Sequence, residues 1–217
     1  MRKLILAAAL ATTALAPISA AAEAGDFLIR GRIIGVLPND DASGIMPAFP
    51  GGSVEVDNAF VPEVDFTYFF TNNIAAELIL ATSPHDINGT GDIGGLGQVG
   101  EVWVLPPTLT VQYHFNPSGP IRPYVGAGIN YTIFYGEDTT SSLNDAIGQT
   151  SLDVDPSLGW AVQAGVDYDI TEKWFANVDV KYINIETEAI LRTGVAANKV
   201  DLDINPLVVG IGVGRRF

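Results

Sequence analysis

The chain has 217 residues, with 25 acidic and 11 basic side chains, and its formal net charge is −14. An acidic chain lacks the basic surface that nucleic acid requires, so nucleic acid is excluded as a partner. The absence of cysteine excludes disulfides, thiol catalysis and zinc–thiolate sites.

The first 22 residues are predicted to be a cleaved signal peptide. Arg2 and Lys3 precede an apolar run from Leu4 to Ala16, and Ala20 and Ala22 then offer an A-x-A cleavage site. A membrane-spanning helix needs about 20 apolar residues, and this run is shorter. Residues 23–217 are then a single mature domain, whose net charge is −14 − 2 = −16 once Arg2 and Lys3 are removed.

Alternation of apolar and polar residues recurs along the mature domain and predicts β-strands. In PEVDFTYFF, for example, Val64, Phe66, Tyr68 and Phe70 share one parity, and TLTVQYHF and WFANVDVKY repeat the pattern. Eight strands are expected, at 27–37, 54–70, 74–83, 107–115, 124–135, 158–170, 174–186 and 202–217.

The predicted connections alternate between long and short. The long ones are 38–53, 84–106, 136–157 and 187–201, and the shorter ones are 71–73, 116–123 and 171–173. Long loops at one rim and short turns at the other are typical of an outer-membrane barrel. We therefore expect an all-β fold, an eight-stranded antiparallel up-and-down transmembrane β-barrel.

Alternation alone leaves a second fold open, because a soluble sandwich or lipocalin-like barrel also has one apolar face per strand. Aromatic residues beside the short turns favour a membrane, since interfacial girdles form there. They are Tyr68, Phe70, Tyr113, Phe115, Tyr168 and Trp174. Dependence of the protein on detergent would exclude the soluble alternative.

Several stretches resemble the OmpW family of Gram-negative outer-membrane proteins, which includes the AlkL alkane importers. They are LPPTLTVQYHF at 105–115, RPYVGAGINYT at 122–132, TNNIAAELILAT at 71–82, AGVDYDI at 164–170 and the terminal GVGRRF. The resemblance implies an eight-stranded barrel in the outer membrane that passes small hydrophobic molecules. It also implies that Phe217 is a signal to the barrel-assembly machinery.

The chain departs from that pattern in two places. Arg215 stands where outer-membrane barrels commonly have an aromatic residue, and the Gly-rich segment 86–100 has no recognisable counterpart. Arg215 falls on the lipid-facing parity, close enough to the interface for its guanidinium to reach the headgroups at a cost of about 0 to 1 kcal/mol.

The polar parity of the strands predicts a charged network inside the barrel. Its members are Arg30, Arg32, Glu63, Asp65, Glu77, Gln112, His114, Gln163, Asp167, Asp169, Asn177, Asp179 and Lys181. Buried charges must pair, and an eight-stranded barrel is only wide enough for its own side chains. We expect this network to fill the lower lumen and to hold the barrel together.

A filled lumen predicts that a hydrophobic solute enters an outer funnel and leaves sideways into the bilayer. Pro62 cannot donate a ladder hydrogen bond and is the expected exit, while Leu158 and Trp160 are expected funnel walls. The alternatives are a structural or receptor barrel without significant transport, and a membrane enzyme acting on lipids. No Ser, His and acid set converges on one face, so no enzyme is predicted.

Motifs for cofactors and metals are incomplete, and no cofactor is predicted. GTGDIG at 89–94 lacks the helix that a dinucleotide site requires, so a flexible surface loop is expected there. DLDINP places Asp201 and Asp203 at calcium-loop spacing, but Pro206 replaces the required glycine. His85 and His114 have no partner histidine at ligand spacing. The solute and the oligomeric state are not indicated.

Overall fold

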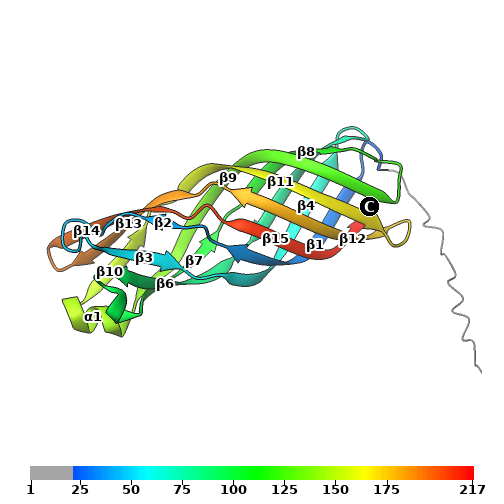
Figure 1. Cartoon of the computed structure of the whole chain (residues 1–217). Coiled ribbons are helices and arrows are strands. Elements are labelled where there is room, and N and C mark those ends of the chain that lie inside the picture. The colour runs from blue at the N-terminus through cyan, green and yellow to red at the C-terminus, as the bar shows by residue number, and fades with distance from the viewer. Residues whose placement is uncertain (1–21) are drawn as a thin grey trace, which may run out of the picture.

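The computed structural model describes residues 22–217, and the predicted signal peptide lies outside them apart from Ala22. Eight strands form the barrel: β1 (Phe27–Leu37), β4 (Ala59–Phe69), β5 (Ile74–Ala81), β8 (Thr108–His114), β9 (Ile121–Thr139), β11 (Ser157–Asp169), β12 (Trp174–Ile183) and β15 (Leu207–Arg216). They pair antiparallel in the order β11-β12-β15-β1-β4-β5-β8-β9, and β9 pairs with β11 to close the barrel (Figure 1). The predicted fold class is confirmed.

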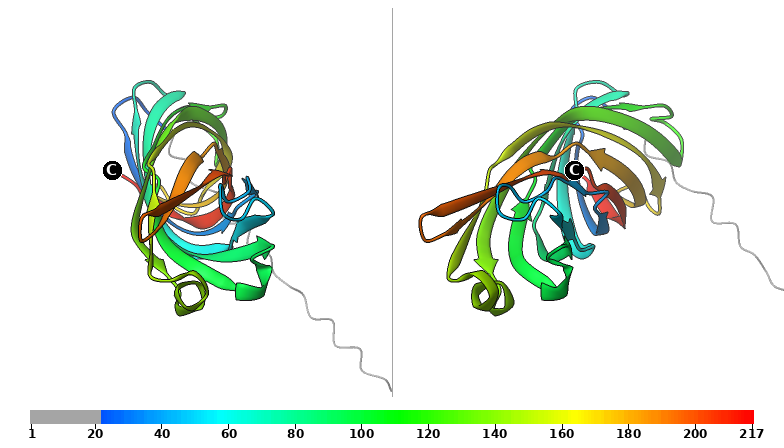
Figure 2. Two further views of the ribbon diagram at one scale, coloured as in Figure 1. Left: turned by 90° about the vertical axis from the view of Figure 1, so that its left-hand side faces the viewer. Right: turned by 60° about the vertical axis from the view of Figure 1, so that its left-hand side comes forward.

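The long connections are not the loops that the sequence predicted. They contain β2 (Asp41–Ala42), β3 (Gly52–Val56), β6 (Ser83–Gly91), β7 (Gln98–Leu105), β10 (Thr150–Val154), β13 (Glu186–Thr193) and β14 (Ala196–Asp203), with η1 (Gly94–Leu96) and α1 (Ser141–Ile147). These elements, which we call the outer extension, continue the barrel wall (Figures 1 and 2). Two groups of strands build it, β9-β7-β6-β3 and β10-β13-β14-β2.

Two predicted strands are also wrong in their boundaries. The expected strand 54–70 is divided at residues 57–58 into β3 and β4, and the expected strand 202–217 is divided after Asp203 into β14 and β15. In each case the chain passes from the outer extension into a barrel strand, and its two parts pair with different neighbours. The barrel is therefore shorter than the predicted strands.

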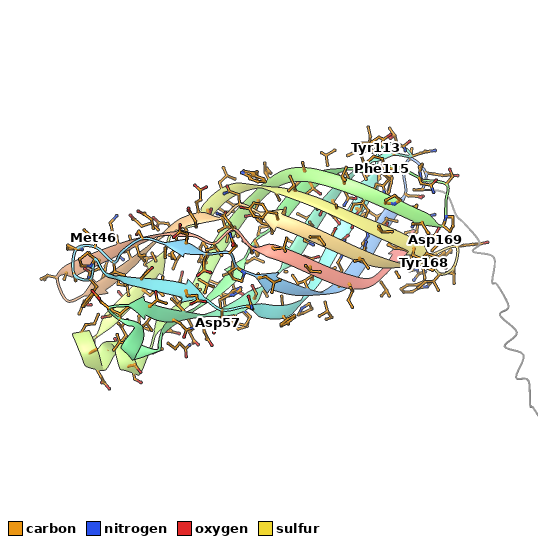
Figure 3. All side chains as sticks on the ribbon, viewed as in Figure 1. Met46, Asp57, Tyr113, Phe115, Tyr168 and Asp169 are labelled. Atoms are coloured by element: carbon orange, nitrogen blue, oxygen red, sulfur yellow. The ribbon has the colours of Figure 1, made fainter. Side chains whose placement is uncertain are left out.

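The barrel is apolar outside and polar inside, as expected for a wall in lipid. On β15, Leu207, Val209, Ile211 and Val213 are exposed, while Gly210 and Gly214 face inward and are buried. Tyr113, Phe115 and Tyr168 gather at the end that carries the short turns, and Met46 lies at the opposite end (Figure 3). Within residues 22–217, no helix has the length and apolarity needed to cross a bilayer.

Two inward glycines are required by close approach of larger side chains. A Cβ at Gly214 would collide with the Phe175 ring and lie 2.9 Å from Cγ of Arg30. A Cβ at Gly165 would collide with the Tyr124 hydroxyl group. The small residues of the inner face therefore make room for the arginine and the tyrosine that fill the lumen.

Candidate functional site: a charged plug below an apolar interior

A charged network fills the lower lumen of the barrel, and we call it the polar plug. It contains eleven of the thirteen residues predicted for the lumen, each no more than 5% exposed: Arg30, Arg32, Glu63, Asp65, Glu77, Gln112, His114, Gln163, Asp167, Asp179 and Lys181. The other two predicted residues, Asp169 and Asn177, are buried with them. The eleven come from six of the eight barrel strands, β1, β4, β5, β8, β11 and β12, so the plug ties most of the wall together.

Two arginines of β1 organise the plug. The guanidinium of Arg30 lies 2.9 Å from Asp65 and 3.0 Å from Asp167. The guanidinium of Arg32 lies 2.6 Å from Glu63 and 2.9 Å from Asp65. Each arginine thus pairs with at least two carboxylates, which offset the desolvation of its buried guanidinium.

Glu77 of β5 is the acceptor at the centre of the plug. It lies 3.3 Å from both Arg30 and Arg32. The side-chain amides of Gln112 and Gln163 donate to its other oxygen at 2.7 and 2.6 Å. Contacts from four residues on three other strands, β1, β8 and β11, hold this carboxylate in place.

The sequence analysis missed two members of the plug, Arg122 and Tyr124 of β9, which are 0% and 1% exposed. The Tyr124 hydroxyl donates to Asp179 at 2.8 Å, and Arg122 pairs with Asp169. The expected strand began at residue 124, but β9 begins at Ile121. Gly126 and Gly128 face inward, and residues 124 and 122 share their parity. Extending the strand to residue 121 would therefore have placed both residues in the lumen.

Above the plug, an apolar cavity occupies the interior, and we call it the inner chamber. About 870 Å³ of space between atoms lies within it and its open mouth, of which about 60 Å³ is free to a water-sized group. Apolar walls come from the barrel and from the outer extension, and include Ile34, Ile79, Val102, Val104, Phe134, Ile183, Ile185, Leu202 and Val208. Glu63, Lys181 and Thr108 also line it. Glu63 and Lys181 pair at 2.9 Å, so the plug forms the floor of the chamber.

The wall beside the inner chamber has a stretch without ladder hydrogen bonds, which we call the side seam (residues 58–62 facing 82–85). The β4–β5 ladder begins at Glu63 opposite Ala81, and the β3–β6 ladder ends at Val56 opposite Ile87. Within residues 22–217, a backbone hydrogen bond from the Asp57 N–H to the Asp86 carbonyl closes the upper end of this stretch.

A proline lies on each edge of the side seam. Pro62 directly precedes the first β4–β5 pair, and Pro84 lies on β6, whose other edge pairs with β7. Proline has no N–H to donate, which is why it occurs at unpaired strand edges. His85 closes the upper end, where its Nδ1–H donates to the Asp57 carbonyl at 2.8 Å and its ring lines the inner chamber.

Leu158 and Trp160 do not lie where a funnel wall is needed, and this prediction is corrected. Their side chains are 74% and 50% exposed on the outer surface of β11. In the register they stand opposite Tyr131 and Ile129, which are also outward. The parity of β11 turns Ser157 and Ala161 inward instead. The inner chamber is lined by other strands.

The remaining motifs lie in the outer extension or at the rim. Gly89 and Gly91 of GTGDIG belong to strand β6 instead of the expected flexible loop, and Asp201 and Asp203 belong to strand β14. A strand does not wrap around an ion as a calcium loop does. Within residues 22–217, no group of three or more His, Cys, Asp or Glu side chains is arranged to hold a metal. Phe217 is exposed beside Arg215.

Known proteins share both the sequence and the fold. The OmpW family model matches residues 23–217. Outer membrane protein W of Vibrio cholerae is 39% identical over 213 residues, covering 97% of this chain and 96% of that protein. The dibenzothiophene metabolism operon protein PahQ of Pseudomonas aeruginosa is 30% identical over 170 residues, covering 77% of this chain and 76% of that protein.

Two solved structures have the same fold. The crystal structure of the outer membrane protein OprG from Pseudomonas aeruginosa has a TM-score of 0.85 and 33% identity, covering 92% of this chain and 99% of OprG. The structure of AlkL in lipid bilayers has a TM-score of 0.67 at 24% identity, covering 100% of this chain and 97% of AlkL. The chain belongs to the OmpW family and is a β-barrel of the Gram-negative outer membrane.

Proposed function

We propose that the barrel passes small hydrophobic molecules from the outside into the lipid of the outer membrane. The solute enters the apolar interior, meets the polar plug and leaves through the side seam. The proposal rests most directly on one juxtaposition: the apolar inner chamber lies on a charged floor and beside a stretch of wall without ladder bonds. It assigns no catalytic step.

The polar plug explains why the exit is sideways. Its buried charged side chains are Arg30, Arg32, Arg122, Lys181, Glu63, Asp65, Glu77, Asp167, Asp169 and Asp179. An apolar solute gains nothing by displacing paired charges, whose separation costs several kcal/mol per ion. Lipid tails offer the same solvation as the chamber, so transfer through the seam is close to neutral.

The outer side of the seam is suited to contact with lipid. Phe60 of β4 is 78% exposed there, next to Pro62. The relative PahQ is named as a protein of a dibenzothiophene metabolism operon, and dibenzothiophene is an apolar aromatic compound. The same solute class is proposed for this chain.

Replacing Pro62 with valine tests the route. Valine restores an N–H, so the β4–β5 ladder can extend upward and narrow the seam. Uptake of 1-bromooctane is followed in proteoliposomes with a lipopolysaccharide outer leaflet, through quenching of a pyrene-labelled lipid in the inner leaflet. We expect the initial rate to fall by about tenfold, as a barrier increase of about 1.4 kcal/mol would produce.

The matched control is Pro123→Val, which alters a β9 proline that pairs with Val166 of β11, away from the seam. Its uptake should equal that of the unaltered protein. Equal uptake by Pro62→Val and Pro123→Val would sink the lateral route. If neither bromooctane nor small sugars move in the unaltered protein, the structural or receptor alternative replaces transport.

A further inference from the structure

The outer extension contains a second apolar cavity at the tip of the molecule, the tip chamber. It holds about 790 Å³ of empty space, counting its mouth. Phe49, Ile93, Val99, Leu143 and Ile147 are among its apolar walls, which come from the 43–51 segment, the β6–β7 connection, β7 and α1. Figure 1 shows α1 at this end, far from the short turns.

A smaller cavity, the middle chamber, lies between the tip chamber and the inner chamber. It holds about 330 Å³ between the two strand groups of the outer extension. It shares Val54, Val99 and Leu191 with the tip chamber. It shares Ile87 and Leu202 with the inner chamber. The three chambers thus form one apolar row from the tip to the polar plug.

With its open mouth left out, the tip chamber still has about 250 Å³ of room for water-sized groups, which is unusual in a protein interior. Interiors pack to a density of about 0.74–0.76, and unfilled apolar cavities cost stability. The residues between the chambers also belong to one continuous hydrophobic cluster, so longer side chains could have filled the gaps. The unfilled space is suited to binding a small apolar molecule.

On these grounds we infer that the tip chamber is a first binding site for a small, neutral, apolar solute, and that Ile87 and Leu202 set the width of solute that passes inward. The inference rests on the proposed function for its second step. Binding in the tip chamber does not depend on transport.

The chemistry of the tip selects the solute. Asp92 and Asn198 are the polar side chains among the residues that line the tip chamber. The Asn198 side chain accepts from the Ala48 N–H at 3.1 Å, so its oxygen is engaged. An anion would face Asp92 without a cationic partner in the lining, whereas a hydrocarbon meets apolar walls.

The first experiment uses crystals of the folded protein under xenon pressure, because xenon enters dry apolar cavities. We expect xenon density in both the tip chamber and the inner chamber. Ala146 of α1 lines the tip chamber, and Ala146→Trp should remove the tip density and leave the inner density. Asp145→Trp, at the neighbouring exposed position outside the lining, should change neither. Absence of xenon from the tip of the unaltered protein would overturn the inference.

The second experiment asks whether the tip chamber is on the route. At low bromooctane concentration, Ala146→Trp should slow uptake by about tenfold through loss of the first apolar site. Asp145→Trp should not. Unchanged uptake by Ala146→Trp would make the chamber a dead end and overturn its place on the route. Xenon in the tip chamber of a barrel that transports nothing supports the binding site and overturns the proposed function instead.

The third experiment tests the width filter. Ile87→Ala and Leu202→Ala should each raise the uptake of bromoadamantane relative to bromooctane by severalfold. The ratio is independent of the amount of folded protein. The control is Val209→Ala, which makes a similar truncation on the lipid-facing side of β15. If the ratio in both chamber variants equals that of Val209→Ala, these residues do not set the width.

Discussion

At the scale of single residues, paired charges inside the barrel are the most informative feature. Glu77 receives contacts from Arg30, Arg32, Gln112 and Gln163, all of them buried. The sequence predicted that these residues face the lumen, because each polar residue alternates with a lipid-facing one along its strand. It could not predict which carboxylate faces which arginine, since that depends on the register between strands far apart in the chain.

Glu77→Ala should therefore destabilise the barrel strongly. Loss of the carboxylate leaves two buried arginines short of an acceptor, which costs about 3 to 5 kcal/mol. The free energy of unfolding in urea, measured in detergent or lipid, checks this value. Glu172→Ala in an exposed turn is the control and should change that free energy by less than about 0.5 kcal/mol. Equal effects of the two substitutions would mean that the plug contributes no net stability.

Arg215 is outward and lies between two aromatic rings at the periplasmic rim. Its guanidinium is 5.6 Å from the Trp174 ring centroid and 4.7 Å from that of Phe217. Contacts of this kind at exposed sites contribute about 0.5–1 kcal/mol, and a tyrosine would replace them with aromatic packing at the girdle.

We expect Arg215→Tyr to assemble at least as well as the unaltered protein. The measure is the fraction of folded, heat-modifiable protein on an unheated SDS gel. A clear loss of that fraction would show that the arginine has a role beyond the girdle, such as binding lipid phosphate.

At the scale of elements, the barrel strands were predicted well and the outer extension was not. Apart from Arg215 at the rim, the lipid-facing residues of the barrel are apolar or aromatic, so their alternation with polar residues is strong. In the extension, glycines interrupt β6 and β7, and Pro106 and Pro107 separate β7 from β8. The apolar faces of these strands point inward to the chambers. The pairing between strands determines this direction, and the sequence does not give that pairing. Leu158 and Trp160 were predicted on the wrong side of the wall. At this end of β11 the sequence does not show which of two alternating sets of residues faces inward.

His85 links the two edges of the side seam and gives that element a dependence on pH. Its ring contacts the Asp57 carbonyl and Ser83, and the Asp57 and Asp86 carboxylates are nearby charges. Burial lowers the pKa of His85 below its ordinary value, against the opposing effect of Asp57. The unfolded chain therefore binds a proton at a higher pH than the folded protein does.

The stability that neutral His85 contributes is complete above its ordinary pKa and is lost as the pH falls toward the lower pKa of the folded state. Unfolding free energies of the unaltered protein should fall more between about pH 7.5 and about pH 5 than those of His85→Gln. Other groups titrate equally in both proteins and cancel in the difference. Parallel pH curves for the two proteins would contradict this role.

At the scale of the whole molecule, charge is divided between the interior and the outer extension. Residues 38–58, 82–107, 133–156 and 184–206 contain sixteen acidic and two basic side chains, so their net charge is 2 − 16 = −14. The buried charges of the barrel comprise five cations and six anions. The acidity seen in the sequence therefore lies around the route of entry, where its field repels anions.

Neutral naphthalene should consequently enter faster than 2-naphthoate, and the difference should shrink as salt rises. The Debye length falls from about 10 Å at 0.1 M to about 3 Å at 1 M salt, which screens the acidic extension. Parallel uptake assays at the two salt concentrations measure the ratio. A ratio that does not change with salt would show that the surface charge has no part in selection.

The position of a bound solute tests the central claim most directly. Crystals of the folded protein soaked with 1-bromooctane allow the bromine to be located by anomalous scattering. The apolar route predicts bromine in the inner chamber and between residues 58–62 and 82–85 of the side seam. Bromine confined to the outer lipid-facing surface, with both interior positions empty, would contradict the account.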